Sequence, residues 1–153
     1  MKIAIFDIDD TLLYDSKVDG SNVTFNVNDQ VRRWVYYCSD RGYELVILTL
    51  RPDTEVSRVV LEKQLEAVGV WDRINFVYMC PEDYDPIVFK KDVRWQLLST
   101  DDLSIIMNFG DQDTDFYWYD MPDIQPVLVS KSRRFSITSF SVDDINIVEI
   151  KCQ

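Results

Sequence analysis

Two pairs of aspartates follow apolar runs that are typical of buried strands. Asp7 and Asp9 follow the run KIAIF, and Asp111 and Asp115 follow the run LSIIMNF. Like charges this close repel each other, and an isolated buried carboxylate is unfavourable, so such pairs need a positive partner. A divalent cation and a phosphoryl group make such a cluster tolerable, and the hard cation that prefers oxygen ligands in this setting is Mg²⁺. The acidic pairs therefore predict a magnesium site that takes part in phosphate chemistry.

Further polar groups suited to binding phosphate lie near other predicted strand and helix ends. Thr49 lies near the end of the apolar run YELVILTL, and Arg51 comes just beyond it. Lys90 and Lys91 lie near the start of a predicted helix, and a lysine ammonium group can neutralise the oxygens of a transferring phosphoryl group. Lys90 shares a helix face with Arg94, four residues later, while Lys91 competes for the same role.

The composition excludes several other kinds of site. The chain has 153 residues and no histidine, which excludes Ser-His-Asp and Cys-His catalysis and any histidine-ligated metal. Its three cysteines are far apart and lack CxxC spacing, so we expect neither a disulfide framework nor a thiolate zinc site. The net charge of −11 predicts no strong polynucleotide binding. No run is long enough to span a bilayer, so we expect a cytoplasmic protein with no membrane partner.

Short apolar runs alternate with amphipathic segments, and this alternation predicts the elements that position the polar groups. The expected strands are 2–6, 43–50, 74–79, 103–109 and 126–130, and the expected helices begin after Asn28, after Asp53 or Thr54, and near residue 87. Strands that alternate with helices form βαβ units, which predict an α/β fold: a parallel sheet of about five strands with helices on both faces. In such a sheet, functional groups gather at the carboxyl ends of the strands.

Four motifs in this order resemble the haloacid dehalogenase-like (HAD) phosphohydrolase superfamily. They are FDIDDTLL, ILTLR, FKKDVR and FGDQDTDF, and the resemblance covers about residues 2–129. It is closest to the branch of acid phosphatases and vegetative storage proteins, and the phosphatase domains of polynucleotide kinases are similar more weakly. The resemblance implies a Rossmannoid three-layer sandwich with a phosphatase domain at 1–130 and a C-terminal extension of unknown role at 131–153.

The resemblance also implies catalytic roles. Asp7 is expected to be the nucleophile that forms an aspartyl phosphate, and Asp9 the general acid and base. Thr49 and Lys90 are expected to complete the catalytic set. The expected ligands of Mg²⁺ are Asp7, Asp9 through its backbone carbonyl, Asp111 and Asp115.

The expected phosphate and substrate contacts come from two segments. Thr49, Leu50 and Arg51 lie near a helix start, where backbone N–H groups favour phosphate. Leu50 stands where the superfamily commonly has glycine. Asp10 is the remaining candidate, with a solvated turn position as its alternative reading.

The gaps between the motifs leave no room for a large cap domain. The segment from Leu12 to Val27 contains Asp19-Gly20, which predicts a small hairpin-like flap and candidate substrate contacts. An open site suits a phosphorylated small molecule, a nucleotide or the phosphorylated end of a macromolecule. The oligomeric state stays open.

Two alternatives to a phosphomonoesterase remain. One is a non-catalytic HAD-like storage or regulatory protein, against which the presence of both Asp7 and Asp9 speaks. The other is a receiver-type signalling domain, whose phosphoacceptor should end the third strand, where this chain has VYMC.

Overall fold

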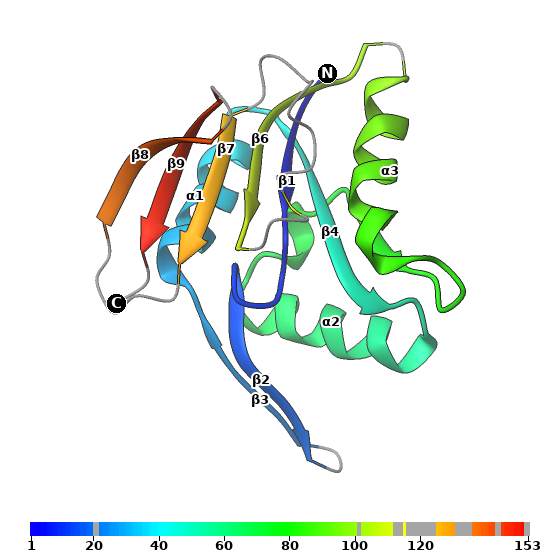
Figure 1. Cartoon of the computed structure of the whole chain (residues 1–153). Helices are drawn as coiled ribbons and strands as arrows, with labels where there is room; N and C mark the ends of the chain where they lie inside the picture. Colours follow the sequence, from blue (N-terminus) through cyan, green and yellow to red (C-terminus); the bar gives the residue numbers. More distant parts are fainter. Residues whose placement is uncertain are drawn as a thin grey trace.

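The computed structural model describes residues 1–19, 22–100, 102–111, 115, 125–130, 136–142 and 145–151. Strands and helices alternate through the first two thirds of the chain, as the sequence predicts, and strands predominate after that (Figure 1). In chain order the elements are β1 (Lys2–Phe6), β2 (Leu13–Asp19), β3 (Asn22–Val27), α1 (Asp29–Asp40), β4 (Glu44–Pro52), α2 (Glu55–Ala67), the 3₁₀ turn η1 (Trp71–Arg73), β5 (Phe76–Cys80), α3 (Pro86–Leu98), β6 (Ser104–Gly110), β7 (Gln125–Ser130), β8 (Ser136–Val142) and β9 (Ile145–Lys151).

The main sheet has the strand order β5-β4-β1-β6-β7-β9-β8. All neighbours in this sheet are parallel except β8 and β9, which are antiparallel. The five strands predicted from the sequence are β1, β4, β5, β6 and β7, and the prediction of a mostly parallel α/β sheet is confirmed. The segment INIVEIK, for which the sequence predicted no place, is β9 and pairs with β7.

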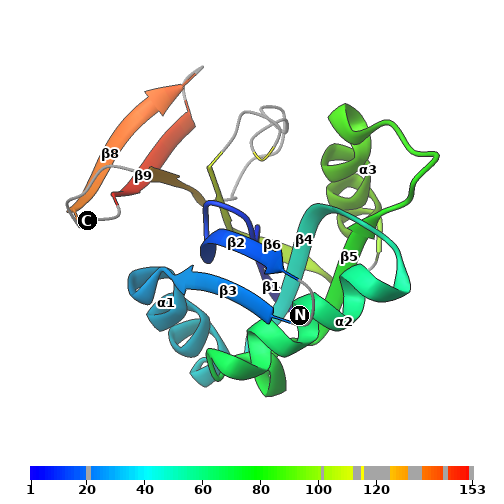
Figure 2. The ribbon, with the colours of Figure 1, turned by 90° about the horizontal axis from the view of Figure 1, so that it is seen from below.

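Helices cover both faces of this sheet (Figure 2). Along β1, side chains alternate between the faces: Ala4 and Phe6 pack in one apolar cluster with residues of α1 and α2, while Ile3 and Ile5 pack in a second cluster with residues of α3. This alternation follows from the period of two in an extended strand. The three-layer arrangement expected from the resemblance is therefore confirmed.

Side chains fix the starts of the helices. Oδ1 of Asn28 accepts hydrogen bonds from the N–H groups of Gln30 and Val31 at 3.1 and 3.3 Å, so Asn28 caps α1 as predicted. Of the two candidates for α2, Thr54 is the cap. These caps satisfy N–H groups that have no partner inside the helix.

A two-stranded hairpin, β2–β3, is the predicted flap and extends away from the main sheet (Figure 1). Among the described residues, this hairpin and α1 are the only elements between β1 and β4, so this gap holds no large cap domain. Within the described part of the chain, no helix combines the length and apolar character needed to cross a membrane.

Candidate active site

The carboxyl ends of β1 and β6 lie side by side because these two strands pair in parallel. Phe6 is the register partner of Phe109, and the two rings stack with centroids 4.5 Å apart. The pairing continues one residue further, where the N–H of Asp7 donates to the carbonyl of Phe109 at 3.0 Å. Asp7 and Asp111 therefore emerge at the same edge of the sheet, although they are far apart in the sequence.

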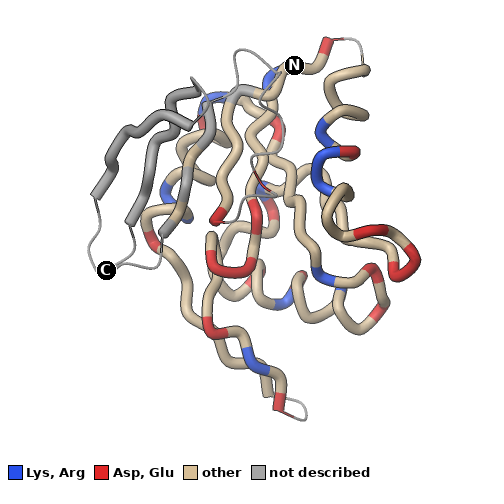
Figure 3. The backbone as a smooth tube through the Cα atoms, in the orientation of Figure 1, with Lys and Arg blue, Asp and Glu red and all other residues tan. Residues whose placement is uncertain are grey.

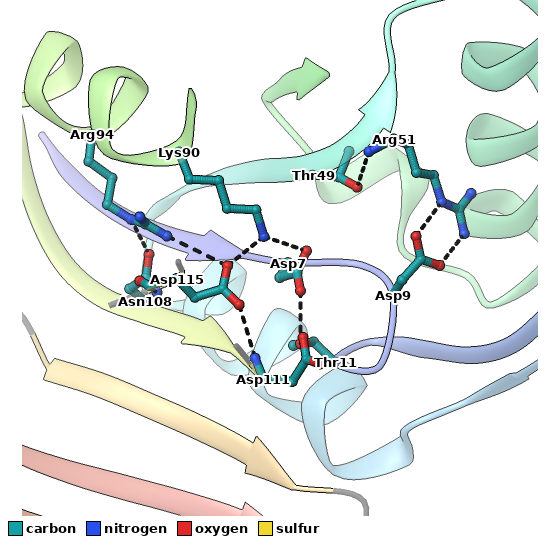
Figure 4. Close-up of polar contacts among 10 residues, drawn as sticks. All are labelled: Asp7, Asp9, Thr11, Thr49, Arg51, Lys90, Arg94, Asn108, Asp111 and Asp115. Carbon is teal, nitrogen blue, oxygen red and sulfur yellow. Dashed lines mark hydrogen bonds and ion pairs between the residues drawn. The ribbon is translucent and has the colours of Figure 1, made fainter. Parts of the chain in front are cut away.

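Asp7, Asp111 and Asp115 form a carboxylate cluster at this edge (Figure 4). One oxygen from each residue lies within 4.8 Å of the others. The Thr11 hydroxyl lies 3.3 Å from Oδ2 of Asp7 and 3.2 Å from Oδ1 of Asp111, so it can donate to one of these oxygens at a time. Asp7 and Asp115 are buried. Buried carboxylates lose their hydration, so they need positive charge close by to compensate.

Lys90 supplies part of that charge from α3. Its Nζ lies 2.8 Å from Oδ1 of Asp7 and 2.5 Å from Oδ1 of Asp115, and the residue is only 2% exposed. Lys91 is exposed on the same helix. Of the two candidate lysines, the fold brings Lys90 to the carboxylates.

Arg94, one turn after Lys90, helps to hold Asp115 in place. Its Nε donates to Oδ1 of Asn108 at 2.8 Å, and Nδ2 of Asn108 donates to the backbone carbonyl of Asp115 at 3.1 Å. The Arg94 guanidinium also lies 3.8 Å from Oδ1 of Asp115. Oδ2 of Asp115 accepts from the N–H of Asp111 at 3.1 Å, so Asp115 is fixed from both sides.

Burial is the largest single influence on the pKa values of the cluster. Desolvation, reinforced by the charge of Asp115, raises the pKa of Asp7 well above its ordinary value, while Lys90 acts in the opposite direction. Desolvation likewise raises the pKa of Asp111. Burial lowers the pKa of Arg94 to about 10. Burial also lowers the pKa of Lys90, but Asp7 and Asp115 outweigh it and the net shift is upward.

The donor set of the cluster fits a divalent cation. Three carboxyl groups meet here beside two cationic side chains, Lys90 and Arg94, so the cluster has more acidic than basic groups. Carboxylate oxygens are the ligands that Mg²⁺ prefers. The predicted ligands Asp7, Asp111 and Asp115 come together here, whereas the Asp9 carboxylate lies outside the cluster.

Asp9 departs from the direction of Asp7 because the chain turns immediately after β1. The N–H groups of Thr11, Leu12 and Leu13 all donate to the carbonyl of Ile8, which ends the extended conformation. The Asp9 carboxylate instead pairs with Arg51: Nε and Nη2 of Arg51 lie 2.9 and 2.8 Å from its two oxygens. A guanidinium that meets both oxygens of a carboxylate is a strong and directional partner.

A cavity of about 260 Å³ opens beside the carboxylates. It is lined by Asp7, Asp9, Thr49, Leu50, Arg51 and Lys90. Thr49 is buried at 1% exposure, and its Oγ1 accepts from the N–H of Arg51 at 3.2 Å. Of the residues predicted to contact phosphate, Thr49, Leu50 and Arg51 thus share one cavity. Asp10 is not among the described residues that line it. Asp10 lies in the turn after β1, with φ of 62°.

Thr11 and Asn108 were not singled out from the sequence. Thr11 is the hydroxyl residue two positions after Asp9, and Asn108 is the polar residue in the otherwise apolar run IIMNF. A buried polar side chain needs a partner, so an asparagine in a core strand is a signal that could have identified Asn108. Acidic residues also gather on the loop between β5 and α3 (Figure 3).

The chain matches a known protein family. A family model described as the LNS2 domain of PITM 1-3 matches residues 4–130. No curated protein matches the chain. The match covers the carboxylate cluster, Lys90 and every residue that lines the cavity.

Two solved structures resemble the chain at low sequence identity. A hypothetical protein from Xanthomonas campestris has a TM-score of 0.52 and 20% identity, over 83% of this chain and 63% of that one. A structure described as a 3-deoxy-D-manno-octulosonate 8-phosphate phosphatase from Vibrio cholerae has a TM-score of 0.47 and 18% identity, over 82% and 65% of the two chains. The chain thus spans less than two thirds of the length of either structure. At 20% identity, the similarity to the Xanthomonas campestris protein concerns the fold alone.

Proposed function

Because the chain belongs to the family of LNS2 domains, which have a HAD-like phosphatase fold, we propose that it is a Mg²⁺-dependent phosphomonoester hydrolase with Asp7 as its nucleophile. The single observation that carries the proposal is the position of Asp7: its carboxylate lies in a cluster suited to a cation, contacts Lys90, and lines the cavity. A carboxylate in this setting can attack phosphorus, provided that the negative charge of the phosphoryl oxygens is offset.

In the first step, an oxygen of Asp7 forms a bond to phosphorus while the bond from phosphorus to the leaving oxygen breaks. Asp9 gives its proton to that leaving oxygen, so the alcohol departs neutral and the phosphoryl group remains on Asp7 as a mixed anhydride. Asp9 lines the same cavity as Asp7, which supports this division of roles. In the second step, Asp9 takes a proton from the attacking water, and the Asp7 carboxylate is regenerated with release of phosphate.

Lys90 and Thr49 are proposed to hold the transferring group. The Lys90 ammonium already lies against Asp7 and can neutralise an oxygen of the phosphoryl group, and the Thr49 hydroxyl can donate to another. Asp7, Asp111 and Asp115, with the backbone carbonyl of Asp9, would hold Mg²⁺. When bound, this ion supplies positive charge to the phosphoryl oxygens and to the acidic cluster.

The proposed substrate class is a phosphorylated small molecule, a nucleotide or a phosphorylated macromolecular end. The cavity is small, and the described residues around it include a hairpin flap but no large cap domain. The site therefore has room for a phosphoryl group, and the rest of the substrate would extend outward beside β2 and β3.

The test is release of phosphate from p-nitrophenyl phosphate by the purified chain. We expect turnover with Mg²⁺, loss of turnover in EDTA, and loss in Asp7→Asn. The matched control is Asp83→Asn, which removes an exposed carboxylate from the loop between β5 and α3 and should keep full activity. Rapid quenching should trap a hydroxylamine-sensitive phosphate label on Asp7. Absence of turnover across a broad panel of phosphomonoesters would instead favour the non-catalytic storage or regulatory alternative.

A further inference from the structure

Arg51 is anchored from several directions at the end of β4. Its Nη1 donates to Oε1 of Gln64 at 2.6 Å, and its Nη2 lies 3.4 Å from Oγ of Ser16. Gln64 is 1% exposed on α2, and its Nε2 also donates to Ser16, at 3.2 Å. The Arg51 side chain itself is 12% exposed, so this guanidinium is part of a fixed network that joins β4, α2 and the flap.

Asp9 depends on this network for its orientation. The Asp9 side chain is 49% exposed and follows a tight turn, and both of its oxygens accept hydrogen bonds from Arg51 (Figure 4). A half-exposed carboxylate without such a partner samples several rotamers in water. The anchored guanidinium therefore selects one position for a carboxylate that would otherwise be mobile.

We infer that Arg51 is a positioning residue for Asp9 and is not a phosphate-binding residue; this inference rests on the proposed function. The guanidinium N–H groups contact Asp9, Gln64 and Ser16, and the charge of Asp9 offsets that of Arg51. An arginine engaged in this way has little left to offer a phosphate group. The contact of Arg51 with Gln64, which is buried, also opposes a swing of the side chain toward Asp7.

Arg51 lies where it can stabilise the carboxylate that forms when Asp9 loses its proton. As the bond from phosphorus to the leaving oxygen breaks, the Asp9 proton moves to that oxygen and the electron pair of its O–H bond stays on Asp9. The new carboxylate is then paired by Nε and Nη2 of Arg51, as the structure shows it. A cation preorganised where negative charge develops lowers the barrier to that step.

This role predicts that the effect of Arg51 depends on the leaving group. Phenyl phosphate needs protonation of its leaving oxygen more than p-nitrophenyl phosphate does, because the nitro group stabilises the departing anion. In Arg51→Ala, kcat/KM for phenyl phosphate should therefore fall by about 10-fold or more beyond the fall for p-nitrophenyl phosphate, since a general acid contributes about 100-fold or more. Arg51→Lys keeps the charge but not the paired contacts, and it should show the same pattern with a smaller loss.

A double-variant cycle separates positioning from phosphate binding. In the Asp9→Asn background, adding Arg51→Ala should change kcat/KM less than about 3-fold, because residues that act as a unit are not additive. Arg58→Ala is the matched control: Arg58 lies on α2 and pairs with Asp53 at the surface, and its loss should leave kcat/KM for both substrates unchanged. Equal losses for both substrates, or a full loss in the Asp9→Asn background, would overturn the inference in favour of phosphate binding. A wild-type protein that hydrolyses neither ester refutes the proposed function and the inference with it.

Discussion

Gly110 and Asp115 lie so close together that a Cβ atom at position 110 would be 2.3 Å from Cγ of Asp115. The last residue of β6 must therefore be glycine for the Asp115 carboxylate to lie against the backbone and reach Lys90. A glycine at this position thus shapes the carboxylate cluster directly, without contributing a side chain of its own.

Gly110→Ala should consequently displace Asp115 and lower kcat/KM by about 100-fold, comparable to removal of one charge-stabilising group. The control is Gly42→Ala, which has no heavy atom within 4 Å of the added methyl but is strained by φ of 77°. This control should lose about 1 kcal/mol of stability and keep its activity. Urea unfolding and steady-state kinetics on both variants measure the difference. Full activity in Gly110→Ala would mean that activity does not depend on the position of the Asp115 carboxylate.

Lys90 and Lys91 should differ sharply although they are neighbours in the chain. Lys90→Ala leaves Asp7 and Asp115 without their shared ammonium group, so kcat/KM should fall by about 100-fold or more. Lys91→Ala removes an exposed charge and should stay within about 2-fold of the wild type. Kinetics with p-nitrophenyl phosphate rank the two variants, and Lys90→Gln is the substitute if Lys90→Ala fails to fold. The reverse ranking would contradict the assignment of Lys90.

Asp7→Asn should inactivate the protein and yet stabilise it when no divalent cation is present. The pKa of Asp7 is raised by burial, so the folded state holds this proton more tightly than the unfolded state does. Stability contributed by the proton is then lost as the pH rises through the folded-state pKa. In EDTA at neutral pH, Asp7→Asn should therefore be more stable than the wild type, because a neutral amide avoids the cost of ionising a buried carboxyl group.

Thermal unfolding in EDTA at several pH values tests this expectation. The advantage of Asp7→Asn should shrink as the pH falls to the ordinary pKa of an aspartate and below it, because wild-type Asp7 is then protonated in the folded state and increasingly in the unfolded state. Lys90 keeps Asp115 as a partner in the variant, so the cluster does not lose its only ion pair. A variant that is less stable than the wild type at every pH would show that the contact with Lys90 outweighs the cost of burial.

Binding of Mg²⁺ should be visible without any turnover. A ligand that binds only the folded state at 100 times its Kd stabilises that state by about 2.7 kcal/mol. The Tm of the wild type should therefore rise with added Mg²⁺, and Asp111→Asn should remove most of that rise. Asp83→Asn, an exposed site outside the cluster, should respond as the wild type does. An equal rise in all three proteins would indicate binding elsewhere.

Much of the fold could be predicted because it depends on local patterns. The apolar run before Asp7 and the cap at Asn28 each depend on a few adjacent residues, and the structure places β1 and α1 accordingly. The rule that parallel strands end at one edge then brings Asp7 and Asp111 together without knowledge of any side-chain conformation.

The remaining features depend on contacts between distant side chains. The partner of Asp9 is Arg51, and this pairing exists because the turn after β1 redirects Asp9 toward the end of β4. Alternation along an extended strand would have kept Asp7 and Asp9 on the same side. The role of Thr11 between two carboxylates depends on the same turn. No pattern of spacing in the sequence encodes these rotations.

The parallel pairing of β1 with β6 also sets the order in which the protein can mature. A chain emerging from the ribosome presents Asp7 and Lys90 well before Asp111, so the acidic cluster stays incomplete until β6 has been made and has inserted beside β1. Contacts between residues so distant in the chain close slowly, because their loop entropy must be overcome first. Recovery of a competent cluster during refolding therefore reports the insertion of β6 beside β1, and not the earlier formation of the separate helices.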